Sequence, residues 1–261
     1  MEVRLDGRVA LITGGSMGMG KAMAQKLAAS GAEVAIVARR AEPLAETARE
    51  IVAAGGRCRA YAGDVSKADE VSRLFSAVTA DLGRVDILVN NAGRSQAAKF
   101  EELTDEIWQG DFDLKVFAAV RFARLAFPEM KNRRWGRIIN VLNIGAKAPG
   151  PGSAPTTVMR AAGMALTKVL AGEGAPYNVL VNALMTGLIV SDQWVRRHRS
   201  VAPQQPFEEF LAEQAKAQRL PMGRFGTAEE FANIACFLAS ETASYISGTA
   251  INVDGARSPV V

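Results

Sequence analysis

A glycine-rich segment near the start of the sequence has the residue types and spacing of a phosphate-binding turn. It runs from Thr13 to Gly20, between an apolar run and a predicted helix, and reads Thr-Gly-Gly-Ser-Met-Gly-Met-Gly. Glycine lets the backbone turn sharply and come close to a ligand, and the N–H groups at a helix start attract an anion. The glycine spacing differs from the commoner dinucleotide-binding fingerprint. The residues predicted to surround the phosphate are Gly14, Ser16, Met17, Gly18, Met19 and Gly20.

The elements that would position this turn are short apolar segments that alternate with helical patterns. This alternation predicts an α/β fold with a doubly wound, mostly parallel, seven-stranded sheet of the Rossmann-like type. The predicted strands are Val9 to Thr13, Glu33 to Ala38, Cys58 to Ala62, Val85 to Asn90, Arg137 to Leu142, Val179 to Leu184 and Ala250 to Val253. No internal repeat or linker interrupts the pattern, so residues 1–261 are predicted to form a single domain.

Helix ends and one insertion complete this outline. Capping boxes are predicted at two helix starts, and glycines are predicted to end three helices. The boxes pair Ser66 with Asp69 and Thr227 with Glu230, and the glycines are Gly31, Gly55 and Gly83. A polar, helix-prone segment at about 191–218 follows the sixth strand. Because ligands bind at the carboxyl edge of such sheets, this segment is predicted to be a lid.

The composition predicts one soluble cytoplasmic protein. Of its 261 residues, 49% are hydrophobic, which is enough to bury a substantial core. We find no signal peptide and no apolar run of membrane-spanning length, so no membrane partner is predicted. Cys58 and Cys236 fit no metal spacing and are interpreted as buried thiols of a reducing compartment. The basic runs 131–137 and 196–199 are interpreted as solvated surface, so no nucleic-acid partner is predicted.

With these elements placed, the chain resembles the short-chain dehydrogenase/reductase family over essentially its whole length. Beyond the Thr-Gly-x-x-x-Gly-x-Gly loop, the motifs that carry the resemblance are Asp64-Val65, Asn90-Asn91-Ala92-Gly93, Gly136-Arg137-Ile138-Ile139-Asn140, Val181-Asn182-Ala183, Ser247-Gly248 and Val253-Asp254-Gly255. The resemblance implies one dinucleotide-binding domain over residues 1–261. It also implies a homodimer or homotetramer paired through helices at about 104–131 and 156–172. The second helix has small residues that permit close helix approach, namely Ala161, Ala162, Gly163 and Ala165.

The resemblance also assigns further residues to the cofactor. In the family, the residue at Asp64 lies by the adenine ring, Asn90 supports the cofactor side of the site, and the backbone at Ile189 meets the nicotinamide amide. The other residues implied are Val65, Ala92, Gly93, Gly187 and Ser191. The family's usual proline before the glycine at position 187 is replaced by Thr186.

The residues at the end of the second strand indicate which cofactor binds. NAD enzymes place an acid there for the ribose hydroxyls, whereas this chain has Ala38-Arg39-Arg40. A guanidinium can meet a 2'-phosphate with two parallel hydrogen bonds, and no acid is present to repel that phosphate. NADP(H) is therefore predicted in preference to NAD(H). The alternative is that Arg39 and Arg40 are solvated residues at a helix start.

The positions that carry the family's proton transfer all differ in this chain. Flanking motifs locate these positions without gaps. In place of the family's asparagine, serine, tyrosine and lysine, the sequence has Lys115, Asn143, Thr156 and Arg160. The family's reaction needs a phenol whose pKa a nearby ammonium lowers, and a threonine hydroxyl is far too weak an acid for that role. The resemblance therefore implies a divergent member that lacks the ordinary catalytic residues.

The replacement residues would form a cationic pocket. Lys115 and Arg160 favour an anionic substrate or an enolate, and their mutual repulsion lowers the pKa of the lysine. Asn143 could hydrogen-bond a carbonyl group. The alternative is that Lys115 snorkels or pairs with Asp111 or Asp113, with Arg160 as a structural replacement. The single histidine, in the predicted lid, is either a surface residue or a general acid; it is His198.

Three classes of function follow from this pattern. The first is an NADP(H)-dependent oxidoreductase that acts on a small carbonyl or alcohol substrate with a rebuilt proton donor. The second is a non-redox lyase, isomerase or hydrolase that uses the cations to stabilise an oxyanion. The third is a catalytically silent NADP-binding protein or subunit partner. We prefer the first class, because selection for hydride chemistry explains the cofactor loop most simply. No metal site is predicted.

Overall fold

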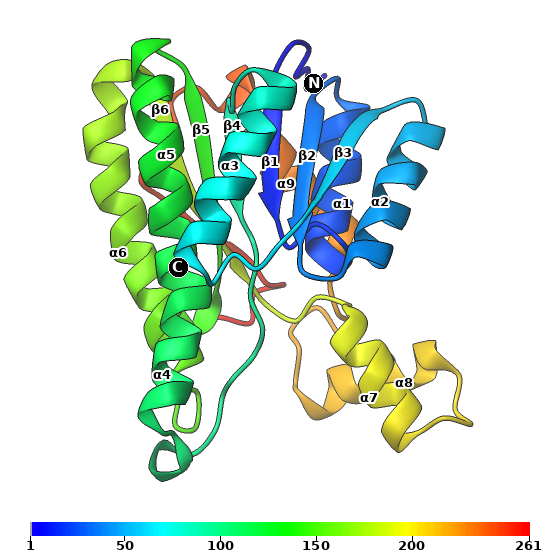
Figure 1. The fold of residues 1–261 in the computed structure, drawn as a ribbon. Coiled ribbons are helices and arrows are strands. Elements are labelled where there is room, and N and C mark those ends of the chain that lie inside the picture. Colours follow the sequence, from blue (N-terminus) through cyan, green and yellow to red (C-terminus); the bar gives the residue numbers. More distant parts are fainter. Residues whose placement is uncertain (1) are drawn as a thin grey trace.

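The apolar segments of the sequence form one sheet in the computed structural model, which describes residues 2–261. All seven strands are parallel and lie in the order β3-β2-β1-β4-β5-β6-β7 (Figure 1). They are β1 (Val9–Thr13), β2 (Glu33–Ala38), β3 (Arg57–Ala62), β4 (Ile87–Asn90), β5 (Gly136–Asn143), β6 (Val179–Thr186) and β7 (Ala250–Val253). The strand order reverses between β1 and β4, and sheets of this kind bind ligands beyond the carboxyl ends at that point. The predicted doubly wound α/β fold is confirmed.

The predicted strand bounds are confirmed for β1, β2 and β7, while the others differ at their ends. β3 begins one residue earlier than predicted, at Arg57. β4 begins two residues later than predicted, at Ile87, and the Asp86 carboxylate just before it accepts a hydrogen bond from the main-chain N–H of Val9 in β1. β5 and β6 continue beyond their predicted ends, since Asn143 pairs with Thr186 across them.

Helices cover both faces of the sheet. In Figure 1, α1, α2 and α9 cover one face, and α3, α5 and α6 cover the other. Their bounds are α1 (Gly18–Ala29), α2 (Ala41–Ala53), α3 (Ala68–Leu82), α5 (Ala118–Asn132), α6 (Thr156–Gly174) and α9 (Ala228–Leu238). Short helical turns are η1 (Phe100–Glu102), η3 (Ile144–Ala146), η4 (Ala175–Tyr177) and η5 (Glu241–Ala243). Among residues 2–261, no helix has both the length and the apolar character needed to cross a bilayer.

Three helices lie beyond the carboxyl ends of the strands. α4 (Asp105–Phe112) extends below the sheet in Figure 1 and runs into α5 through a π-helical turn, η2 (Asp113–Phe117). α7 (Asp192–Val201) and α8 (Phe207–Ala217) form a separate lobe on the other side of that edge. These two helices occupy most of the segment predicted to be a lid.

The predicted helix ends are confirmed with one exception. Gly31, Gly55 and Gly83 have positive φ just after helices, and the Thr227–Glu230 capping box is present in both directions. The predicted box between Ser66 and Asp69 is wrong. The Asp64 carboxylate accepts hydrogen bonds from the main chain and the hydroxyl of Ser66, so α3 begins after Lys67 without a side-chain cap.

The small residues of α6 do not all face outward, as close approach to another helix would require. A Cβ placed on Gly163 would lie 2.7 Å from the Leu142 side chain, so this glycine lets α6 pack closely on β5. Ala165, by contrast, is exposed. The interpretation of the whole small-residue set as an intersubunit surface is therefore wrong for Gly163.

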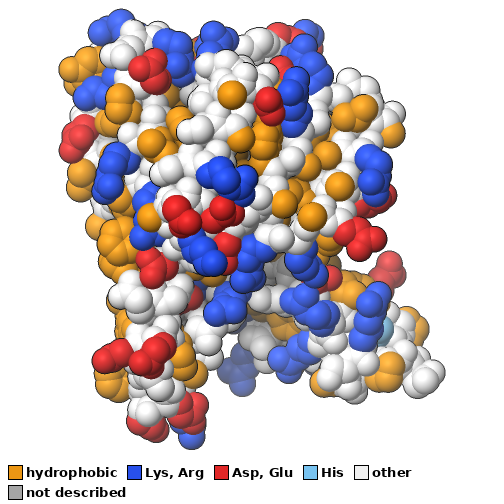
Figure 2. All heavy atoms as spheres, viewed as in Figure 1, with side chains coloured by type: hydrophobic (Ala, Val, Ile, Leu, Met, Phe, Trp, Pro, Cys, Tyr) orange, Lys and Arg blue, Asp and Glu red, His pale blue; other side chains and the backbone are white. Residues whose placement is uncertain are grey.

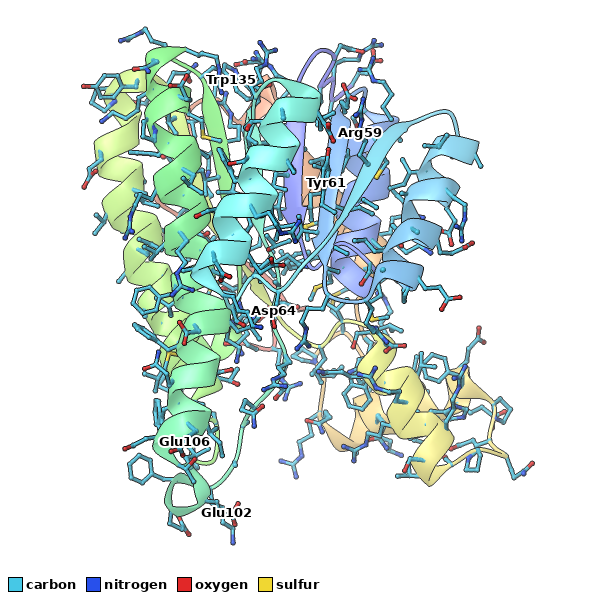
Figure 3. All side chains as sticks on the ribbon, in the orientation of Figure 1. Arg59, Tyr61, Asp64, Glu102, Glu106 and Trp135 are labelled. Carbon is cyan, nitrogen blue, oxygen red and sulfur yellow. The ribbon has the colours of Figure 1, made fainter. Side chains whose placement is uncertain are left out.

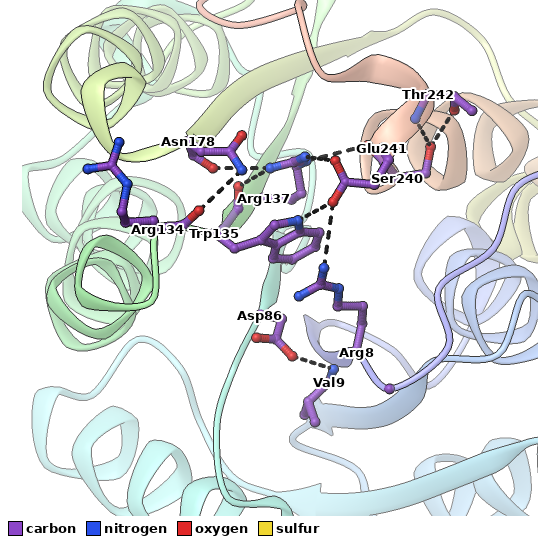
Figure 4. A network of polar contacts seen from close by, with 12 residues as sticks. Arg8, Val9, Asp86, Arg134, Trp135, Arg137, Asn178, Ser240, Glu241 and Thr242 are labelled. Carbon is purple, nitrogen blue, oxygen red and sulfur yellow. Dashed lines mark hydrogen bonds and ion pairs between the residues drawn. The ribbon is translucent and has the colours of Figure 1, made fainter.

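A buried arginine anchors the amino-terminal edge of the sheet, opposite the predicted site (Figure 4). Arg137 is 0% exposed, and its guanidinium lies 3.3 Å from the Glu241 carboxylate. The Trp135 indole N–H donates to the same carboxylate, and Arg8 lies 3.6 Å from the centre of the indole ring. Burial lowers the pKa of Arg137, and the charge of Glu241 opposes that effect.

Replacing Glu241 by Gln should destabilise the protein, because Arg137 would keep its buried charge without a carboxylate. We expect the free energy of unfolding to fall by about 1–3 kcal/mol. Chemical denaturation monitored by circular dichroism measures this change. The matched control is Glu46→Gln, which removes an exposed ion pair with Arg49 on α2 and should cost about 0–0.5 kcal/mol. Equal effects of the two substitutions would contradict the assigned role of Glu241.

Candidate active site

The glycine-rich loop after β1 folds tightly against the start of α1. Gly14 and Gly18 have φ values of 70° and 53°, in the left-handed region that favours glycine. A Cβ on Gly20 would lie 2.1 Å from the Gly14 carbonyl oxygen, so no larger residue fits there. The Asn91 amide donates to that oxygen and ties the loop to the end of β4. α1 begins after Met17 without a side-chain cap, which suits its first N–H groups to an anion.

A cavity of about 380 Å³ opens beside this loop at the carboxyl ends of the strands. Arg39 and Arg40 line it after β2, and Asp64 lines it after β3, at the edge of the sheet seen in Figure 3. Arg40 reaches back over the loop to the Met17 sulfur, at 3.0 Å. The predicted cofactor residues that line this cavity are Gly14, Ser16, Met17, Arg39, Arg40, Asp64, Val65, Ala92 and Gly93.

The other cofactor residues predicted after β6 lie outside this cavity; they are Gly187, Ile189 and Ser191. Ile189 pairs with Gly226 and lines a second cavity of about 290 Å³. The end of β6 nevertheless meets the glycine-rich loop, because the Thr186 hydroxyl donates to the Met19 sulfur at 3.6 Å. The two groups of predicted residues thus occupy neighbouring parts of one sheet edge.

Lys115 lies in the π-helical turn between α4 and α5, and its side chain is 0% exposed. Its ammonium contacts both oxygens of the Asp111 carboxylate, at 2.5 and 2.7 Å. It also donates to the Thr156 hydroxyl at 2.9 Å, and this hydroxyl accepts a second bond from the main-chain N–H of Gln96. The alternative pairing with Asp111 is therefore present, whereas Asp113 pairs with an arginine of α5.

Arg160 lies one turn after Thr156 on α6 and points toward the same place. Its guanidinium donates to the Val141 carbonyl oxygen at 2.6 Å. A Cβ on Gly93 would lie 2.5 Å from this guanidinium, so the glycine leaves the space that Arg160 fills. Burial lowers the pKa of Arg160 to about 10, and the group stays protonated at neutral pH.

The electrostatic balance at Lys115 lowers its pKa to about 8. Burial is the largest cause, because it disfavours the charged form of an amine. The positive charges of Arg160 and Arg94 act in the same direction, while Asp111 opposes them. The ammonium is therefore an acid that can give up its proton close to neutral pH.

A cavity of about 10 Å³, close to the size of one water molecule, lies among these residues. Lys115 and Arg160 line it, together with Asn90 and Asn140 of the neighbouring strands. The Asn90 amide donates to Asn140, which leaves the Asn90 side-chain oxygen buried without a hydrogen-bond partner among residues 2–261. The fourth predicted catalytic residue, Asn143, ends β5; within the described chain its buried side-chain oxygen also accepts no hydrogen bond.

Three of the four predicted catalytic residues are thus brought together, and no hydrogen bond within residues 2–261 joins Asn143 to them. No pattern in the sequence predicted that the main-chain N–H of Gln96 bonds to Thr156 or that Asn140 accepts a bond from Asn90. No sequence signal marks the π-helical turn either. The spacing of four residues between Asp111 and Lys115 was the signal for their pairing. His198 lies away from this cluster, in the α7–α8 lobe, where it packs against two phenylalanine rings of α8.

Comparison with protein families gives a match over most of the chain. The family described as Enoyl-(Acyl carrier protein) reductase matches residues 14–256. Among curated proteins, the 3-oxoacyl-[acyl-carrier-protein] reductase FabG of Aquifex aeolicus is 32% identical over 256 residues. The matched region covers 98% of this chain and 99% of that protein.

Solved structures match the whole fold. L-Sorbose reductase from Gluconobacter frateurii, complexed with NADPH and L-sorbose, is 36% identical with a TM-score of 0.94, and the match covers 100% of each chain. An NADPH-bound short chain oxidoreductase from Pseudomonas aeruginosa PAO1, which contains an atypical catalytic center, is 34% identical with a TM-score of 0.92. That match covers 99% of each chain.

Proposed function

This chain belongs to the short-chain dehydrogenase/reductase family, and from that premise we propose that it is an NADP(H)-dependent oxidoreductase acting on a carbonyl or alcohol of an anionic small molecule. The observation that carries this proposal is the cavity beside the glycine-rich loop, where two guanidinium groups and no carboxylate follow β2. The loop N–H groups would hold the pyrophosphate, and Arg39 with Arg40 would hold the 2'-phosphate. The bound cofactor would donate or accept a hydride. NADPH in both solved relatives supports this choice.

The proposed catalytic centre is atypical for the family. It consists of Lys115, Asn143, Thr156 and Arg160, with no phenol at the tyrosine position. The Pseudomonas oxidoreductase, also described as having an atypical catalytic center, supports the idea that such a site can belong to a member that binds NADPH. We further propose that the α7–α8 lobe closes over the substrate as a lid.

The charges around the site support an anionic substrate. Lys115 and Asp111 neutralise each other, whereas Arg160 forms no ion pair with any residue of the described chain. Figure 2 shows Lys and Arg side chains gathered around the hollow between the body of the molecule and the α7–α8 lobe. An anion bound near Arg160 would offset its uncompensated charge and use its remaining N–H donors.

We also propose a homodimer or homotetramer paired through α5 and α6. An apolar cavity of about 290 Å³ lies between these helices and is lined by Phe127, Leu166 and Leu170 among others. Val158 and Val169 of α6 are 50% and 57% exposed. Apolar side chains gathered on one face in this way are typical of a surface that a partner covers.

The first prediction concerns the cofactor. NADPH should bind the unmodified protein at least about tenfold more tightly than NADH, because a guanidinium gains a charge-assisted bond to the 2'-phosphate. Arg39→Asp should reverse this order, and isothermal titration calorimetry measures both affinities. Arg49→Asp on the outer side of α2 is the control and should leave the order unchanged. Equal affinities of the unmodified protein for NADPH and NADH would contradict the proposed preference for NADP(H).

Substrate charge gives a second prediction. In steady-state assays of NADPH oxidation, 2-oxo acids should have lower KM values than their neutral amides, and Arg160→Met should reduce that preference by about tenfold. Arg59→Met, an exposed change on β3, is the control. Consumption of a substrate with no change in NADPH absorbance would indicate a non-redox enzyme instead.

The oligomer prediction is tested at the surface of α6. Light scattering should give the mass of a dimer or tetramer at micromolar concentration, and Val169→Arg should shift the population toward monomer by burying a charge in the interface. Val52 on α2 is equally exposed, at 54%, and Val52→Arg is the matched control. A monomeric unmodified protein would refute the assignment.

A further inference from the structure

We infer that the Lys115 ammonium is the acid that protonates the substrate oxygen as hydride is transferred, held in place by Asp111 and Thr156. This inference rests on the proposed oxidoreductase function and names the proton donor that the altered site requires. A phenol fills that role elsewhere in the family, and here its position holds a threonine.

The geometry places the Lys115 ammonium against the residue that stands at the family's tyrosine position, since its Nζ lies 2.9 Å from the Thr156 hydroxyl. Two of its three N–H groups are directed to Asp111 and Thr156, at 2.7 and 2.9 Å. An ammonium has three donors, so one N–H remains for a reacting oxygen. With Arg160, the side chain also lines the water-sized cavity at the carboxyl edge of the sheet. Thr156 accepts bonds from Lys115 and Gln96, which identifies it as a positioning residue for the ammonium.

Other acidic groups of the described chain lie elsewhere or are too weak. Tyr61 is in β3, where its hydroxyl donates to Asp81 at 2.9 Å (Figure 3). Tyr177 and Tyr245 are on the surface, ahead of β6 and β7. His198 lies in the α7–α8 lobe and contacts the Gln205 carbonyl oxygen.

The two thiols are equally remote from the site. Cys58 lies in β3, and burial raises its pKa to about 12. Cys236 lies in α9, against Ser30. Arg160 stays charged across the neutral range, so it can stabilise a developing oxyanion but not release a proton there. Of these groups, only Lys115 both contacts Thr156 and can release a proton near neutral pH.

The groups that face Lys115 set the pH at which it donates. Asp111 from α4 raises its pKa, while Arg160 from α6 and Arg94 from the loop after β4 lower it. Because the acid form is required for carbonyl reduction, activity should be present at low pH and fall as the pH rises through the pKa of Lys115.

In the proposed step, hydride transfer and proton transfer convert the carbonyl group into an alcohol. A hydride leaves NADPH and forms the new C–H bond at the carbonyl carbon, while the C=O π electrons take up a proton from the Lys115 N–H. The products are the alcohol, NADP⁺ and neutral lysine. Solvent returns a proton to the lysine before the next turnover. Alcohol oxidation would be the reverse, with neutral lysine as the base.

The test is the pH dependence of carbonyl reduction at saturating NADPH. For the unmodified enzyme, log(kcat/KM) plotted against pH should be level at low pH and should fall in a single limb that begins near pH 8. Asp111→Asn removes the group that raises the pKa of Lys115 and should move this limb to lower pH. Arg160→Gln removes a group that lowers it and should move the limb to higher pH. A merely structural role for these residues predicts lower activity with an unmoved limb.

Variants of Lys115 test whether the reaction needs a group at this position that can release a proton. Lys115→Arg keeps the positive charge but removes the neutral-range acid, so it should lower kcat by about 100-fold or more, as should Lys115→Met. NADPH affinity, measured by calorimetry, should be retained in both and shows that they fold. Lys168→Met, at an exposed position of α6, should leave kcat unchanged.

These experiments distinguish a failure of the Lys115 assignment from a failure of the oxidoreductase function. An active unmodified enzyme whose limb stays in place in both Asp111→Asn and Arg160→Gln, or whose activity survives Lys115→Arg, would overturn the donor assignment and leave the oxidoreductase proposal standing. Absence of NADPH oxidation by the unmodified protein with every carbonyl tested would overturn both. Opposite movements of the limb in the two variants would establish Lys115 as the donor.

Discussion

The buried ion pair between Lys115 and Asp111 is the interaction on which the rest of the site depends. Two charges removed from water are stable together only when their other polar atoms are also satisfied. The Thr156 hydroxyl accepts a second N–H of the ammonium, and the main-chain N–H of Gln96 holds that hydroxyl in turn. The ammonium therefore joins α4, α6 and the loop after β4. Removing it would leave the Asp111 carboxylate buried without a counterion and would take away the hydrogen bond that links α6 to this turn.

Arg160 determines the net charge of the site, because the other two charges cancel. A guanidinium has five N–H donors, and the protein supplies one close carbonyl acceptor. A Cβ on residue 93 would lie 2.5 Å from one guanidinium nitrogen, so glycine at this position leaves room for the side chain as it lies here. Gly93 also lines the large cavity beside the phosphate loop, so the steric constraint that admits Arg160 operates at the border between the proposed cofactor and substrate sites.

The sequence predicts elements well where a single local rule acts. Apolar runs between turn residues gave β1, β2 and β7 with their observed bounds, and glycines marked the ends of three helices. Prediction failed where two local rules competed. The Ser66 hydroxyl donates to Asp64, two residues earlier, and does not form the predicted capping box with Asp69. Family motifs located Lys115, Thr156 and Arg160, which do meet. The spacing of four residues indicated the pairing of Lys115 with Asp111, but it could not show that the amine also donates to Thr156, because Thr156 lies on a different helix, 41 residues further along the chain.

A buried ammonium differs in one essential respect from the phenol that it would replace. Burial makes an ammonium a stronger acid and a phenol a weaker one, because the ammonium is charged in its acid form. A negative group that enters the site therefore raises the pKa of Lys115 and keeps the donor charged until hydride has moved. In the proposed reaction, an anionic substrate would supply that group beside Arg160. Substrate binding would therefore also favour the protonated form of Lys115. A neutral carbonyl would meet a lysine that is already partly deprotonated near pH 8, and it would react more slowly even when it is bound.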